Sequence, residues 1–146
     1  MEENHIHIYL KLYDFDLQPD EVTKMIGLEP TKSGVKRGNF YFAKKYKIER
    51  EYQSNWWEYK EKHITETKWQ QEYVDDFINR IIKPRVEIIK SITTQGSGEL
   101  ALVPHYYDEW YLGFDFSLDI IKILSDSGIV LNMDIYCYDK EKNKEE

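Results

Sequence analysis

The alternating segment from His5 to Tyr13 is followed, after a short link, by Pro19-Asp20-Glu21-Val22-Thr23-Lys24-Met25-Ile26-Gly27-Leu28-Glu29-Pro30-Thr31. Alternation of apolar and polar residues over this length predicts a half-buried strand. Pro19 suits the first position of a helix, and Gly27 with Pro30 prevents the helix from continuing. The two segments together predict a strand and a short helix that buries Val22, Met25 and Ile26.

The longest helical pattern lies in the middle of the chain. Thr67 and Gln70 have the spacing of a capping box, which predicts the start of a helix. Apolar residues then recur every four positions at Trp69, Tyr73, Phe77 and Ile81, a stripe wide enough to cover a sheet. Pro84 is expected to break or kink this helix, and a second short helical piece follows it.

The C-terminal part predicts strand, helix and strand. Leu100, Leu102 and Pro104 alternate with Ala101, Val103 and His105, which is typical of a strand. Ser117 is a suitable cap for a helix that ends at Gly128 and turns Ile120, Ile121, Ile123 and Leu124 inward. Alternation after Gly128 predicts a last strand with Ile129, Leu131, Met133, Ile135 and Cys137 on its inner face.

A charged connection interrupts the first half of the chain. Residues 39–42 and 55–59 have the pattern of two strands that form a hairpin with each other. Between them, the charged segment from Lys44 to Gln53 is either an exposed, twisted hairpin arm or a mobile loop. Its lysines and β-forming residues favour the arm.

The element order predicts a single α+β domain over residues 1–138, with a charged and disordered tail at 139–146. We expect an antiparallel or mixed sheet with helices packed on one face, and a ferredoxin-like topology is the preferred arrangement. Glu21–Ile26 and Asp119–Leu124 match in charge and apolar spacing. This match indicates a possible internal duplication, although helical periodicity alone produces similar matches.

Composition excludes several classes of protein. The 146 residues carry a net charge of −7. This charge would repel the phosphates of a nucleic acid, so no nucleic-acid partner is expected. A basic protein would be a more suitable partner for an acidic chain. Cys137 is the single cysteine, which excludes an internal disulfide and a cysteine-rich zinc site. No apolar run has the length of a membrane helix. We therefore expect a cytoplasmic protein that binds no membrane.

The block at residues 19–31 also resembles a family of small bacterial proteins known as domain of unknown function 4279. Other similar pieces follow in order: Trp57 in a central strand, the long helix that closes at Pro84, the helix from Phe116 to Leu124, and the final strand at residues 131–136. The resemblance covers roughly residues 6–138, and the segment from Lys44 to Gln53 departs from it. It implies no catalytic residue.

Few residues form a recognisable chemical site. His5 and His7 share one side of a strand and have metal-ligand chemistry, with Asp134 as a conceivable third ligand. Paired histidines on a polar strand face are usually simple surface residues, so we expect no metal and no other cofactor. Cys137 is expected to be buried, where a thiol behaves as a small hydrophobic group rather than a nucleophile. No catalytic residue is predicted.

Large aromatic and acidic residues remain, and these types dominate binding surfaces. The candidate partner-binding residues are Tyr9, Trp56, Tyr106, Tyr107, Asp108, Glu109, Trp110, Tyr111, Asp134 and Tyr136. The leading hypothesis is a non-enzymatic protein-binding module of immunity-protein type with an acidic, aromatic face. The alternatives are a small-ligand sensor or enzyme with a pocket beside Tyr106–Tyr111, and a homodimer. The same loop could instead fold back, so that Trp110 and Tyr111 plug the edge of the core.

Overall fold

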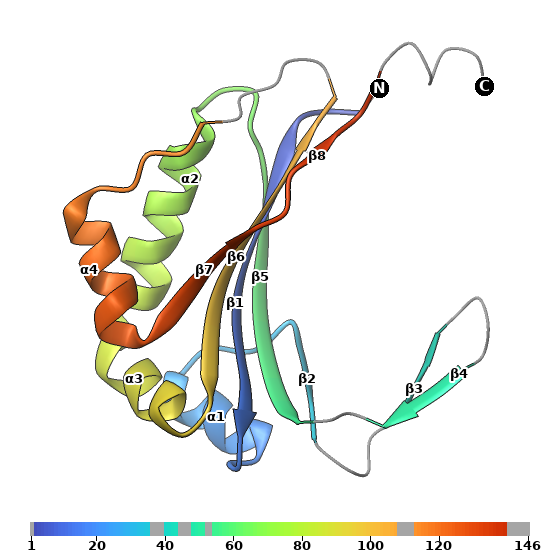
Figure 1. Cartoon of the computed structure of the whole chain (residues 1–146), viewed down its shortest axis with the longest axis vertical. Coiled ribbons are helices and arrows are strands. Elements are labelled where there is room, and N and C mark those ends of the chain that lie inside the picture. Colours follow the sequence, from blue (N-terminus) through green and yellow to red (C-terminus); the bar gives the residue numbers. More distant parts are fainter. Residues whose placement is uncertain (1, 36–39, 44–47, 52–53, 108–112, 140–146) are drawn as a thin grey trace.

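Helices cover one face of a mixed sheet, and none of the described helices lies on the other face (Figure 1). The computed structural model describes residues 2–35, 40–43, 48–51, 54–107 and 113–139. The elements are β1 (His5–Phe15), α1 (Pro19–Ile26), β2 (Lys32–Gly34), β3 (Phe40–Ala43), β4 (Ile48–Glu51), β5 (Asn55–Ile64), α2 (Gln70–Phe77), α3 (Val86–Gln95), β6 (Ser97–Tyr106), α4 (Leu118–Ser127), β7 (Ile129–Met133) and β8 (Tyr136–Cys137). The predicted α+β class is confirmed.

The sheet is built around its N-terminal strand. Its order is β2-β5-β1-β6-β7, with β8 also paired to β6. The pairings from β2 to β6 are antiparallel, whereas β7 and β8 run parallel to β6. The connections through α1 and through α2–α3 each skip one strand, so they interleave as two split β-α-β units. The ferredoxin-like topology is not confirmed as predicted, because the parallel strands β7 and β8 extend the sheet.

Strand β1 separates the two faces of the sheet by alternation. From His5 to Tyr13 its even-numbered residues point toward the helices, and Ile6, Ile8, Leu10 and Leu12 are all fully buried. The odd-numbered residues of this stretch lie on the opposite face, because successive side chains in a strand point to opposite sides. The register shifts after Tyr13, so that Phe15 is buried in the core. The strand prediction is therefore confirmed in both position and orientation.

Helix α1 packs on the sheet through β5. Trp57 of β5 is fully buried, and its indole Nε1 donates a hydrogen bond to Thr23 Oγ1 at 3.0 Å. Val22 and Ile26 are buried as predicted, but Met25 is 39% exposed, so its predicted burial is wrong. Met25 therefore lies at the edge of the apolar stripe, and the buried residues of the helix are Pro19, Val22 and Ile26.

The central helix begins two residues later than predicted. Trp69, not Thr67, occupies the cap position, and its backbone N–H donates to the Glu72 carboxylate at 3.1 Å. A π-helical turn at Ile78–Ile82 and a 3₁₀ turn at Lys83–Arg85 separate α2 from α3, which confirms a break at Pro84. The Arg85 guanidinium donates to the backbone carbonyls of Ile26 and Ile81.

Helix α4 has the ends that the sequence predicts. Ser117 Oγ accepts a hydrogen bond from the Ile120 backbone N–H, and Gly128 ends the helix in the left-handed conformation at φ 72°. Ile121, however, is 49% exposed, so its predicted inward position is wrong. It occupies the solvent side of a helix whose other side rests on α3 and β7. The proposed duplication of α1 and α4 stays a prediction.

The last predicted strand is two short strands at the sheet edge. Its pairing is interrupted between Met133 of β7 and Tyr136 of β8. Cys137 follows on β8 and is exposed, so its predicted burial is wrong. Met133 and Ile135 are also more than two-fifths exposed. Alternation predicts which side of the strand a residue occupies, but not whether a helix covers it there.

Strands β3 and β4 form a separate two-stranded sheet, and only β4 lies within the charged connection. Phe40 of β3 pairs with Glu51 of β4, and Ala43 pairs with Ile48. The predicted hairpin between residues 39–42 and 55–59 is therefore wrong, because β5 pairs with β2 and β1 instead. Residues 44–47 and 52–53 lie outside the described residues, so the choice between an arm and a loop for Lys44–Gln53 stays a prediction. The tail at 140–146 lies outside the described residues, and none of the described helices has the length and hydropathy to cross a membrane.

Candidate functional site

The site lies on the face of the sheet that the helices leave open. On β1 this face carries His5, His7, Tyr9, Lys11 and Tyr13. The register places residues of β5 and β6 beside each of them; His5, for example, stands between Ile64 and His105. The neighbouring residues on this face are Trp56, Glu58, Lys60, Lys62, Glu99, Ala101, Val103 and His105. This open face is thus aromatic and charged, whereas the residues that β1 turns toward the helices, Ile6 to Leu12, are apolar.

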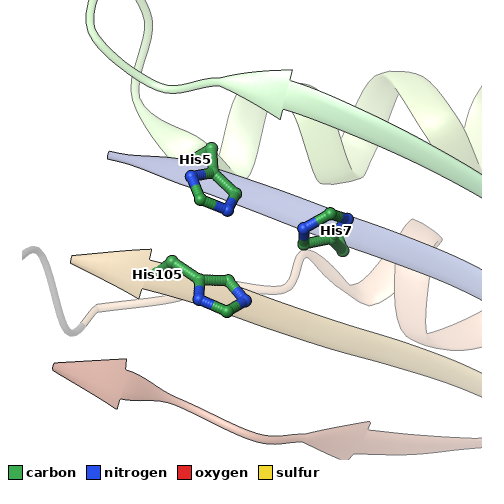
Figure 2. A group of neighbouring side chains, drawn as sticks. All are labelled: His5, His7 and His105. Carbon is green, nitrogen blue, oxygen red and sulfur yellow. The ribbon is translucent and has the colours of Figure 1, made fainter. Parts of the chain in front are cut away.

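Three histidines gather at one end of the open face. His5 and His7 come from β1, and His105 comes from β6 directly opposite His5 (Figure 2). One ring nitrogen of each lies within 4.8 Å of the corresponding nitrogens of the other two. The ring centroids are 5.1 Å apart for His5 and His7, and 5.3 Å apart for His7 and His105. The antiparallel register therefore brings together side chains that are distant in sequence.

Hydrogen bonds orient two of these rings. The Nδ1 atom of His5 lies 2.9 Å from the Glu3 carbonyl oxygen. A carbonyl can only accept, so Nδ1 carries the proton and Nε2 keeps a free lone pair. Nδ1 of His105 lies 2.8 Å from the hydroxyl oxygen of Tyr138. The buried Nδ1 of His7 has no hydrogen-bond partner among the described residues.

The surroundings keep at least two of the imidazoles neutral near pH 7. Burial is the largest of the effects that lower the pKa of His7 to about 4, and the charges of Lys60, His5, His105 and Lys62 supply the remainder. Burial is also the main reason that the pKa of His105 is lowered. A neutral imidazole has a lone pair for a ligand, which an imidazolium lacks.

Aromatic rings continue from the histidines across the sheet. His105 stacks on His5 with centroids 4.5 Å apart and on Tyr136 with centroids 5.0 Å apart. Tyr138 in turn stacks on Tyr107 at 4.3 Å, with only 5° between the ring planes. The rings of β1, β6 and the C-terminal segment thus stack on one another in series. We call this group the ring stack: His5, His105, Tyr107, Tyr136 and Tyr138.

A groove lies next to the ring stack on the same face. Its volume is about 350 Å³, and it is lined by Tyr9, Lys11, Thr31, Lys32, Glu58, Lys60, Val103, Asp134 and Tyr136. Lys11 and Lys60 place their ammonium groups 4.9 and 5.7 Å from the centre of the Tyr9 ring. Lysines outnumber carboxylates in this lining, so this described part of the open face is not the acidic surface that the sequence predicts.

A second polar cluster lies on the helix side of β5. The Arg80 guanidinium donates to both carboxylate oxygens of Glu61, at 2.7 and 3.0 Å. Tyr59 and His63 also contact the same carboxylate, at 2.6 and 3.0 Å. Burial raises the pKa of Glu61, but the hydrogen bonds from Arg80, Tyr59 and His63 outweigh it and bring the pKa to about 2. The pairing ties β5 to the π-helical turn, a structural role.

The described residues contain no nucleophile activated by a base. None of their serine, threonine or cysteine side chains is hydrogen-bonded to a histidine. The hydroxyls of Thr93 and Ser127 bond to backbone carbonyls instead. The described chain thus offers histidine nitrogens and aromatic faces, which are suited to binding.

The candidate partner-binding residues fall into three groups. Partly or fully exposed side chains belong to Tyr9, Trp56, Tyr107, Asp134 and Tyr136. Tyr106 is only 1% exposed, and its hydroxyl donates to Gln70 Oε1, so it cannot contact a partner in this conformation. Asp108, Glu109, Trp110 and Tyr111 lie outside the described residues, and the pocket predicted beside them stays a prediction.

Sequence reasoning missed His105 as the third member of the histidine group. Asp134, the third ligand considered for His5 and His7, is not part of this group. The signal for His105 is its position in the alternation of Leu100–His105, which places it on the polar face of a strand. Alternation does not show that β6 is the neighbour of β1, so the three histidines could not be brought together from the sequence.

Comparisons with known proteins give one match. The family model described as "Domain of unknown function (DUF4279)" matches residues 4–138. No curated protein and no solved structure matches the chain. The matched range includes every described strand and helix, and it contains all three histidines of the group.

Proposed function

The chain belongs to the family of the domain of unknown function DUF4279, and from its open face we propose a non-catalytic protein-binding module of the immunity-protein type. The observation that carries the proposal is the ring stack on an uncovered sheet face. The described helices all cover the other face of this sheet. Stacked rings that no described helix covers are suited to contact another molecule.

The shape of the open face favours a macromolecule over a small one. Small-molecule sites enclose most of their ligand in a concave, mainly apolar pocket. The groove beside the ring stack is instead open and lined mostly by polar and charged side chains. A sheet surface of this kind is suited to a protein partner that also lies flat and covers the rings.

Charge indicates the chemistry of the partner surface. Lys11, Lys32 and Lys60 lie along the groove, against the carboxylates of Glu58 and Asp134. A partner that places carboxylates over these lysines and apolar groups over Tyr136 would complement both features. This differs from the basic partner that the net charge of the whole chain suggests. We propose that the complex forms in the cytoplasm.

Site-specific photocrosslinking tests the proposal. A photoreactive amino acid in place of Tyr136 is expected to crosslink one discrete partner protein in native lysate. The matched control is the same amino acid in place of Leu118, which is 84% exposed on α4 and lies on the helix side of the sheet. Equal crosslinking from both positions, or none from position 136, would contradict the proposed face.

The immunity-type function has a separate test. The captured partner, expressed alone, is expected to inhibit growth, and co-expression of this chain is expected to restore growth. Replacing Tyr136 and Lys60 with Ser should weaken that protection, whereas replacing Leu118 with Ser should not. If the partner is harmless when expressed alone, the immunity role is wrong, although the protein-binding role would still stand.

A further inference from the structure

We propose that His5, His7 and His105 bind one divalent first-row transition-metal ion, with Zn²⁺ as the reference ion. This inference concerns the histidine group alone and does not depend on a protein partner. Three imidazoles are a known ligand set for such ions, since imidazole suits zinc, copper, iron and nickel. Neither the family description nor the sequence pattern assigns this site.

The distances are close to what a shared ion requires. Two nitrogens bound to one tetrahedral zinc ion at 2.0–2.1 Å are about 3.3–3.4 Å apart. The three histidine nitrogens lie within 4.8 Å of one another, so modest rotations of the side chains close the site. His7 and His105 are only half-buried, which leaves room for such rotations. All three residues already share one sheet face, so their side chains approach the ion from the same side.

The hydrogen bonds resemble the outer shell of a metal site. Metal-binding histidines generally donate their second ring N–H to a carbonyl, carboxylate or water, which fixes the ring orientation. His5 donates Nδ1–H to the Glu3 carbonyl, and Nδ1 of His105 contacts Tyr138. His5 thus has Nε2 available for a ligand, and His105 has the same atom available when its Nδ1–H donates to the Tyr138 hydroxyl. His7, whose Nδ1 has no hydrogen-bond partner among the described residues, also has bonding capacity left.

The charges around the three histidines determine the expected affinity for the metal ion and the kind of fourth ligand. The group includes no carboxylate, and Lys60 and Lys62 are near enough to act on His7. These positive charges oppose a cation, so we expect binding weaker than that of a structural zinc site. Three protein ligands leave one coordination position open. The lysines favour an anion there, such as hydroxide or a carboxylate group.

Titration with Zn²⁺ tests the site directly. The full chain, freed of any affinity tag and of metal by chelation, is titrated by calorimetry, and Co²⁺ is added separately to record the visible spectrum of the bound ion. We expect one saturable site per chain. His7→Gln and His105→Gln should each weaken binding at least tenfold. The double variant should show neither saturable Zn²⁺ binding nor the Co²⁺ spectrum.

The remaining histidine supplies a matched control. His63 lies on the helix side of β5, bonded to Glu61, and is not part of the group. His63→Gln should therefore bind Zn²⁺ as the unaltered chain does. The absence of saturable binding, or equal weakening by His63→Gln, would overturn the proposal. So would full retention of binding in the double variant, with thermal unfolding used to verify that each variant is folded.

Discussion

His5 and His105 stand directly opposite each other in neighbouring antiparallel strands, and their rings stack with 14° between the planes. Such cross-strand pairs contribute roughly 0.2–1 kcal/mol to stability. In the presence of a chelator, His105→Gln should therefore lower the free energy of unfolding by less than about 1 kcal/mol. Urea denaturation measures this, and a loss of several kcal/mol would show that the pair belongs to the core.

The stability of metal-free protein should depend on pH through His7. Its pKa is about 4 in the folded chain, below the ordinary 6.5. Between these values the unfolded chain binds more protons, so stability falls as pH falls from 6.5 toward 4. The groups that face His7 are His5 on its own strand, Lys60 and Lys62 on β5, and His105 on β6.

His7→Gln separates this contribution from the others. The variant should flatten the slope of unfolding free energy between pH 6.5 and 5, measured by urea denaturation with a chelator present. That window lies above the ordinary pKa of carboxylates, which limits their contribution. His105, whose pKa is lowered in the same direction, should leave a residual slope. A slope unchanged by His7→Gln would contradict the assignment.

Glu61→Gln should destabilise the fold by about 1–3 kcal/mol, because Arg80 loses the one of its two carboxylate partners that is mostly buried. Only 14% of the Glu61 side chain is exposed. Asp76→Asn is the matched control, since Asp76 contacts the same guanidinium but is 61% exposed. Its effect should stay within about 0.5 kcal/mol. Equal losses in the two variants would show that burial does not set the strength of this pair.

The folded pKa of Glu61 also predicts behaviour in acid. Its value of about 2 lies below the ordinary 4.5, so its contribution to stability is present above pH 4.5 and is lost as pH falls toward 2. Acid titration followed by circular dichroism should give a midpoint at higher pH for Glu61→Gln than for the unaltered chain. An identical midpoint would contradict the low pKa.

Two helix-ending glycines should differ in their response to alanine. Gly27 and Gly128 both have φ near 70°, a conformation that costs a non-glycine residue roughly 1–2 kcal/mol. A Cβ on Gly27 would meet no atom within 4 Å, whereas one on Gly128 would stand 2.4 Å from Thr93 Oγ1. Thermal unfolding should show Gly128→Ala to be less stable than Gly27→Ala, and equal losses would exclude this contact as the cause.

Substitutions of Tyr106 and Tyr136 should have different effects, one on stability and the other on partner binding. Tyr106→Ala removes a fully buried ring, and we expect a loss of about 3–5 kcal/mol. Tyr136 is 49% exposed, so Tyr136→Ala should cost less than about 1 kcal/mol while weakening partner capture. Denaturation measures the loss of stability, and the amount of partner that each purified variant retains from native lysate measures the loss of binding. A Tyr136→Ala protein that is strongly destabilised would remove the distinction.

Local sequence signals predicted the parts of the fold that depend on neighbouring residues. The strand from His5, the helix that ends at Gly27 and the helix capped by Ser117 are all present, because alternation and capping act within a few residues. The Thr67 prediction failed by two positions, since Glu72 rather than Gln70 bonds back to the helix start. Short capping motifs compete, and packing of the whole helix decides between them.

Long-range pairing could not be predicted from the sequence. Alternation places His5, His7 and His105 on polar faces, but only the β1–β6 register places them together. Cys137 and Met133 show the same limitation, because their exposure depends on where helices end over the sheet. The prediction of partner-binding residues had the same limitation. Tyr106 and Tyr107 are adjacent in sequence, yet only Tyr107 faces outward.

In strand β1 the even-numbered residues from Ile6 to Leu12 form the core, and the odd-numbered residues from His5 to Tyr13 form the open face. Odd positions can change to suit a new ligand while even positions keep the core intact, so functional divergence on this scaffold need not reduce foldability. Insertion of one residue within the strand would exchange the two sets, placing histidines among the helices and isoleucines in water. Substitutions, rather than insertions, are therefore the route by which related chains can acquire different open faces.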